Sequence, residues 1–149
     1  MANTVFYHKD FYKTLQNWTK HKSSKVMRAV VISTTGLRDK ENLQKGFTLL
    51  EPLMYDSAVY VKKNLGPFVL GSYFGNAFPE ETLRQLNKWS KIKNEHVRWN
   101  IAIAFNCSFG NKYPDKALKY LKILSNDPSI IAQRGVKSTV NFLKKGILT

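Results

Sequence analysis

The sequence predicts an all-α protein, a short α-solenoid built from about four helical hairpins. Three observations support this prediction: apolar residues recur at helical spacing, one ten-residue phrase occurs twice, and polar stops separate the apolar stretches. No stretch alternates apolar and polar residues as a half-buried strand would. Because 149 residues suit one continuous core, we expect residues 1–149 to form a single domain.

The repeated phrase reads FGNAFPEETL at residues 74–83 and FGNKYPDKAL at residues 109–118, an offset of 35 positions. Moving along the chain from this phrase in steps of 35 or 36 residues aligns apolar residues into columns, with one residue from each repeat. Within a repeat, the residues of neighbouring columns are three positions apart, so they lie on one helical face. The columns of the first helices are Tyr12, Phe47, Leu83 and Leu118; Leu15, Leu50, Leu86 and Leu121; and Trp18, Leu53, Trp89 and Leu124.

A second helix is predicted in every repeat by apolar pairs four residues apart. These pairs are Val26 with Val30, Val61 with Leu65, Val97 with Ile101, and Ala132 with Val136. Polar stops separate the two helices of each repeat, and their Ser, Asn and Asp side chains suit helix N-caps. The stops are HKSS (21–24), YDS (55–57), KIKN (91–94) and NDPS (126–129). The predicted repeats are therefore residues 8–37, 42–75, 79–110 and 114–145.

The repeated phrase is interpreted as the segment that ends one helical hairpin and begins the next. Gly75 and Gly110 are expected to end a helix in the left-handed conformation, and Pro79 and Pro114 to begin the next one. We expect Pro128 in a first turn for the same reason. Neither copy of the phrase has the glycine spacing of a phosphate-binding loop.

The second repeat is expected to depart from a straight helix at two places. Pro52 lies inside LLEPLMY, and the pair Gly66–Pro67 lies inside VKKNLGPFVLG. Each proline removes a backbone hydrogen bond of the helix, and this loss bends the helix. We interpret the bends as changes in the superhelix rather than as walls of a pocket.

The charge balance is strongly positive, with 24 Lys and Arg against 10 Asp and Glu and a formal net charge of +14. A field of this sign attracts polyanions, of which nucleic acid is the commonest and an anionic membrane surface the next. No apolar run approaches the roughly 20 residues of a membrane-spanning helix, and the N-terminus lacks the pattern of a secretory signal. With Cys107 as its one cysteine, interpreted as a small buried hydrophobe, the chain is expected to be cytoplasmic.

Cations and aromatic residues recur in register on the predicted second helices, a pattern that suits contacts to a phosphate backbone. The alternative is an ordinary solvated helix face. The predicted nucleic-acid-binding residues are Lys25, Arg28, Tyr60, Lys62, Lys63, Arg98, Trp99, Arg134 and Lys137. Trp18 and Trp89 share an apolar column and are expected in the core, whereas Trp99 fits either a stacking platform or the core.

Catalytic motifs are scarce in this sequence. His8, His21 and His96 have no metal-ligand spacing among themselves or with Cys107, and no GxSxG or HExxH motif occurs. Most carboxylates stand at predicted helix starts, where the helix dipole explains them. We therefore expect no metal, no cofactor and no catalytic residue.

The segments RQLNKWSKIKNEHVRWNIAIAF and ALKYLKILSNDPSIIAQRGVKSTVNFLKKG resemble the HEAT-like repeat proteins grouped with DNA alkylation repair. The resemblance covers most of the chain, and VKKNLGPFVLG is similar in style. It implies a right-handed solenoid whose concave basic face holds duplex DNA. Some members of that family excise alkylated purines with aromatic residues and an Asp on this face. Trp99 and Tyr60 match the aromatic role, and no Asp of this chain matches the catalytic one.

The sequence thus predicts a monomeric DNA-binding module related to DNA repair that contacts the phosphate backbone, without a membrane partner. Two alternatives remain open. One is an alkylpurine DNA glycosylase or a fragment of one, so whether the chain is an enzyme stays undecided. The other is a protein-interaction scaffold, the commonest use of solenoids, with an acidic protein partner in the groove.

Overall fold

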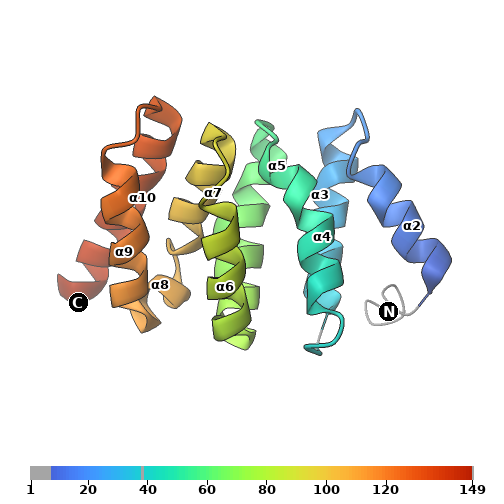
Figure 1. Ribbon diagram of the computed structural model, residues 1–149, viewed down its shortest axis with the longest axis horizontal. Helices are drawn as coiled ribbons and strands as arrows, with labels where there is room; N and C mark the ends of the chain where they lie inside the picture. Colours follow the sequence, from blue (N-terminus) through green and yellow to red (C-terminus); the bar gives the residue numbers. More distant parts are fainter. Residues whose placement is uncertain (1–7, 38, 149) are drawn as a thin grey trace. The chain divides into compact units, whose positions relative to one another are not determined.

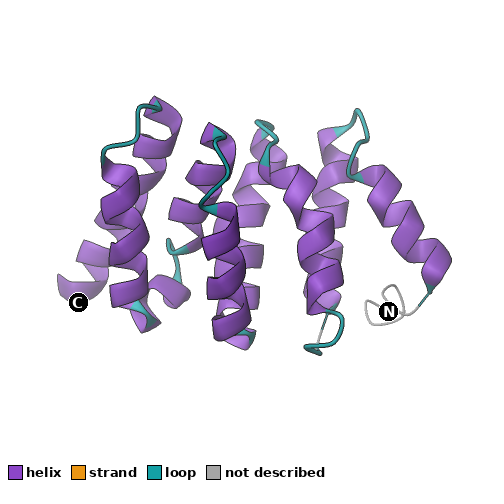
Figure 2. Cartoon of the chain, in the orientation of Figure 1, coloured by secondary structure: helices purple, strands orange, loops and turns teal. Residues whose placement is uncertain are grey.

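Helices make up all the regular secondary structure of residues 8–37 and 39–148, the parts of the chain that the computed structural model describes (Figure 2). The all-α prediction is therefore confirmed for these residues. The chain divides into two compact units, residues 1–65 and 66–149.

The first unit contains two hairpins. Its elements are α2 (Lys9–Trp18), α3 (Ser24–Ser33), the 3-10 helix η1 (Thr34–Gly36), α4 (Leu43–Met54) and α5 (Val59–Asn64). Helix α3 packs against α2, α4 and α5 (Figure 1). The switch from α3 to η1 follows from Ser33, Thr34 and Thr35, whose hydroxyls donate hydrogen bonds to the carbonyls three residues earlier.

The second unit continues with the same alternation of helices. Its elements are the π-helix η2 (Leu65–Gly75), α6 (Pro79–Trp89), α7 (Glu95–Ala104), α8 (Ser108–Lys112), α9 (Pro114–Ser125) and α10 (Ile130–Leu148). Helix α7 packs against α6, α9 and α10, and α10 lies beside α9 (Figure 1). Helices α7 and α10 are the second helices of two successive predicted hairpins, so within this unit these hairpins are neighbours in space.

The apolar columns lie in the core as the periodicity predicts. Leu15, Leu50, Leu86 and Leu121 are all buried, as are Val30, Val61, Ile101 and Ala132 of the second helices. Trp89 is buried, but Trp18 is exposed over 40% of its surface, so the prediction that both tryptophans are core is wrong for Trp18. The column that ends in Leu118 is also less buried than expected, because the side chain of Leu118 is 49% exposed.

The departure expected at Gly66–Pro67 takes the form of the π-helix η2. Proline has no N–H, so the ordinary helical bond cannot form at Pro67, and a π-helix shifts bonding to residues five apart. The hydroxyl of Ser72 donates a hydrogen bond to the carbonyl of Pro67 at 3.0 Å, also five residues back. Pro52, by contrast, lies within an uninterrupted α4.

The glycines of the repeated phrase act by a different mechanism from the one predicted. No described residue has a positive φ, so neither Gly75 nor Gly110 takes the left-handed conformation. A Cβ at Gly75 would lie 2.5 Å from the ring of Phe109, and one at Gly110 would lie 2.0 Å from the carbonyl oxygen of Phe105. These glycines therefore allow close packing. Gly110 lies inside α8 rather than at the end of a long helix.

The proline predictions are met in part. Pro79 and Pro114 open α6 and α9 at the first helical position, as expected. Pro128 precedes α10, which begins at Ile130, so its expected first-turn placement is wrong. The turn is capped by Ser129 instead, whose hydroxyl accepts a hydrogen bond from the N–H of Ile131 at 3.2 Å.

Candidate nucleic-acid interface

In the first unit, four of the predicted site residues are exposed on two helices that pack together. Lys25 and Arg28 lie three residues apart on α3, and Tyr60 and Lys63 lie three apart on α5. These four residues are here called the first-unit surface. Their exposure follows from the helical period, because the apolar residues between them face inward. Met27 and Val30 are buried on α3, as is Val61 on α5, while Lys62 beside it is half-buried.

In the second unit, Arg98 forms a structural ion pair rather than offering a free cation. Its Nε lies 2.5 Å from Oδ2 of Asp127, and its Nη2 donates a hydrogen bond to Oδ1 of the same carboxylate at 3.1 Å. The side chain of Arg98 is 18% exposed and that of Asp127 is 7% exposed. Both carboxylate oxygens thus lie within ion-pair distance of the guanidinium, and the Nη2 contact is a charge-assisted hydrogen bond. The pair ties α7 to the turn before α10.

A second polar contact reinforces the same junction. The hydroxyl of Ser129 donates a hydrogen bond to Oε2 of Glu95 at 2.7 Å, and the N–H of Ser129 donates to Oδ1 of Asp127 at 2.8 Å. The side-chain amide of Gln133 donates to the carbonyl oxygen of Asp127. Glu95 and Asp127 are thus both engaged in holding the start of α10 against α7.

Trp99, which the sequence placed equally well in a core or on a stacking platform, packs on α10. A Cβ at Gly135 would lie 3.0 Å from Cδ1 of the indole, so the glycine makes room for the ring. The side chain of Trp99 is half-buried. Packing between α7 and α10 is therefore one role of this tryptophan, and base stacking by its accessible part stays a prediction.

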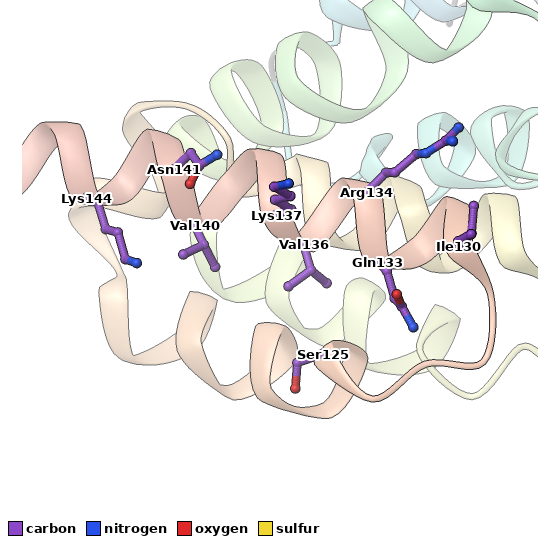
Figure 3. Close-up of a pocket in the computed structure, with 9 residues that line it drawn as sticks. All are labelled: Ser125, Ile130, Gln133, Arg134, Val136, Lys137, Val140, Asn141 and Lys144. Carbon is purple, nitrogen blue, oxygen red and sulfur yellow. The ribbon is translucent and has the colours of Figure 1, made fainter.

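Arg134 and Lys137 are exposed and lie three residues apart on α10. Together they are called the α10 surface. Figure 3 shows Arg134 extending away from α9 and Lys137 nearly end-on, while Val136 and Val140 point toward α9. Helix α10 carries four cations and no carboxylate, so its field is uniformly positive.

These side chains border an open pocket of about 470 Å³, here called the α10 groove. It is lined by Ser125, Ile130, Gln133, Arg134, Val136, Lys137, Val140, Asn141 and Lys144 (Figure 3). The sequence reasoning missed Asn141 and Lys144. The signal was present in their spacing, because Asn141 follows Arg134 by seven residues and Lys144 follows Lys137 by seven, so each shares the side of the earlier residue.

No group of three or more His, Cys, Asp or Glu residues in residues 8–37 and 39–148 is arranged to hold a metal ion. Across those same ranges, no helix combines the length and apolar character that crossing a bilayer requires.

Comparison with protein-family models, with curated proteins and with solved structures gives no significant match to this chain.

Proposed function

We propose that the chain is a nucleic-acid-binding module that contacts the phosphate backbone of duplex DNA. The observation that carries the proposal is the exposure of cations at the same position in three of the four predicted second helices, where the third repeat has Trp99 instead. Arg28, Lys63 and Arg134 occupy the same column of the repeat, and all three are exposed. Backbone contacts by Lys and Arg supply most of sequence-independent DNA affinity.

The proposed architecture behind this function is a right-handed HEAT-like solenoid. The pairing of α3 with α5 in the first unit, and of α7 with α10 in the second, supports it, since stacked hairpins place their second helices side by side. The resemblance of RQLNKWSKIKNEHVRWNIAIAF to HEAT-like DNA alkylation repair proteins also supports it.

Arg98 has a different part in this proposal from the one predicted by its column. Its guanidinium is already paired with Asp127, so a phosphate would have to compete with a bidentate carboxylate. We therefore assign the phosphate contacts of the second unit to Arg134 and Lys137, and assign Arg98 to positioning α10.

The test is the salt dependence of DNA binding, measured by fluorescence anisotropy with a labelled duplex between about 50 and 200 mM salt. Four contacts, from Arg28, Lys63, Arg134 and Lys137, predict a slope of log K against log salt near −3.6 and a loss of affinity of about 100-fold. Arg134→Gln/Lys137→Gln removes two contacts and should reduce the slope by about 2, whatever the base sequence.

The matched control is Lys116→Gln/Lys119→Gln on α9, which removes the same charge at the same three-residue spacing from exposed positions. It should change the slope by less than about 1, because it lies outside the α10 surface. Equal effects of the two double variants would mean that net charge alone attracts DNA, and the assignment of the interface would be wrong.

A further inference from the structure

The α10 groove has a chemistry that duplex binding does not use. Its lining includes the cations Arg134, Lys137 and Lys144 and, on the side toward α9, the half-buried side chain of Val140, whereas Val136 is only 7% exposed (Figure 3). Ile130, at one end, is 63% exposed. A phosphate backbone pairs with cations alone, so an aliphatic wall beside them indicates a ligand that is both anionic and apolar.

The lining argues against nucleic-acid bases as that apolar part. Single-stranded nucleic acids bind proteins by stacking bases on aromatic rings, and the groove is lined by no aromatic side chain. It is lined instead by branched aliphatic residues together with Ser125, Gln133 and Asn141. Hydroxyl and amide groups of this kind suit the polar groups of a polypeptide, and aliphatic walls suit Leu, Ile or Val side chains.

Charge complementarity sets the sign of the partner. Helix α10 has no carboxylate, and the carboxylate nearest to it in sequence, Asp127, is already paired with Arg98. The rim cations of the groove therefore have no acidic neighbour on their own helix. We propose that the α10 groove binds an acidic peptide segment of another protein, with carboxylates on the lining cations and aliphatic side chains against Ile130 and Val140.

The groove also sets the length of the segment. From Ile130 to Lys144 the helix rises by about 21 Å, which a partner helix of about 14 residues would match. An amphipathic helix laid in a groove between two helices presents its apolar face at spacings of three and four residues, and acidic residues on the flanks would reach the rim. The open form of the pocket favours such a segment over an enclosed small molecule.

The experiment uses the full chain and two fluorescein-labelled peptides of about 14 residues, measured by anisotropy in the absence of DNA. One carries Glu and Leu at helical spacing, and the other has every Leu replaced by Ala at the same charge. We expect the Leu peptide to bind about tenfold more tightly than the Ala peptide, because only it has side chains for the aliphatic wall.

Two variants locate the site, and neither alters the α10 surface proposed for DNA. Val140→Thr keeps the shape of the side chain but adds a hydroxyl, so it should abolish the preference for the Leu peptide and leave the Ala peptide unaffected. Lys144→Glu should weaken both peptides by about tenfold. Lys116→Glu, an equal charge change at an exposed position of α9, should weaken them less than about twofold.

Equal affinity of the two peptides, or equal effects of Lys144→Glu and Lys116→Glu, would show attraction by net charge only and would overturn the proposal. If Lys144→Glu weakens duplex binding about tenfold and the Leu peptide does not bind, the groove is a nucleic-acid site instead. Arg134 and Lys137 belong to both proposals, so the two proposals are separated by Val140→Thr and Lys144→Glu, which lie outside the α10 surface.

Discussion

At Arg98 and Asp127, opposite charges meet with little access to water. The carboxylate is 7% exposed and also accepts the N–H of Ser129, so it is well satisfied only while the guanidinium is in place. Removing one member of such a pair leaves a buried charge without its partner, which costs more than the pair contributes when intact. The role of Arg98 is thus set by what lies next to it, a fact that its column in the repeat does not contain.

The substitution Arg98→Met should lower the free energy of unfolding by about 3 kcal/mol, measured by urea denaturation, because Asp127 stays buried without a cation. The double variant Arg98→Met/Asp127→Asn should recover at least half of this loss, since Asn keeps an oxygen for the N–H of Ser129 and carries no charge.

Arg134→Met is the matched control, because it removes an exposed arginine from the α10 surface and should cost less than about 0.5 kcal/mol. If Arg98→Met costs no more than this control, the ion pair behaves as a surface pair. Arg98 would then return to the set of residues available for phosphate.

At the scale of the element, close approach of helices decides where glycine is required. In η2, Gly66, Gly71 and Gly75 are spaced by five and four residues, about one turn of a π-helix each, so they share a face. Cβ atoms there would meet Ile103, the carbonyl oxygen of Ala104 and the ring of Phe109, respectively. A glycine face of this kind brings the backbone of η2 against α7 and α8.

Gly110→Ala should destabilise the protein by about 2 to 3 kcal/mol in urea denaturation, because its Cβ would lie 2.0 Å from the carbonyl oxygen of Phe105, and backbone cannot move as easily as a side chain. Gly146→Ala on α10 is the control. Its Cβ would meet the end of the Asn111 side chain at 3.0 Å, and alanine favours a helix by about 1 kcal/mol, so stability should change little.

A loss for Gly110→Ala as small as that for Gly146→Ala would mean that α8 shifts freely away from Phe105. The close packing would then be incidental to stability, and the repeated phrase would need another explanation for its glycine.

The helices could be predicted because burial of one helix face places apolar residues at a regular spacing in the sequence. Leu15, Leu50, Leu86 and Leu121 recur in step, and each of them is buried in a first helix. The period reports which face is buried, but not how the backbone is hydrogen-bonded, so the π-helix of η2 and the break between α7 and α8 were missed. Both depend on local features, the absent N–H of Pro67 and the extended backbone of Cys107.

The candidate site was predictable to a lesser degree for the same physical reason. Helical spacing predicted exposed cations correctly at Arg28, Lys63 and Arg134. It could not reveal that Arg98 faces Asp127, because that contact joins residues 29 positions apart. Lys144 lies inside the predicted fourth repeat and was missed, although its spacing of seven residues from Lys137 was readable.

At the scale of the whole molecule, both units are basic, and each has its own exposed cations. The first-unit surface and the α10 surface can bind one duplex together or act independently, and these cases differ in their salt dependence. Contacts made simultaneously to one duplex add to the number of released counterions, and each contact contributes about 0.9 to the slope. Contacts made to separate duplexes do not add.

The pairs Arg28→Gln/Lys63→Gln and Arg134→Gln/Lys137→Gln should each reduce the slope by about 2, and the combined variant by about 4, if one duplex spans both units. Anisotropy titrations of all four proteins over the same salt range give the slopes directly.

If Arg28→Gln/Lys63→Gln leaves the slope unchanged, DNA binding is confined to α10. If each pair alone left the slope nearly intact while the combined variant lost it, the two surfaces would be alternative sites, because either could then replace the other. Additive slopes would instead require that Arg28, Lys63, Arg134 and Lys137 reach the same backbone at once, which is the geometric condition that a continuous positive trough imposes.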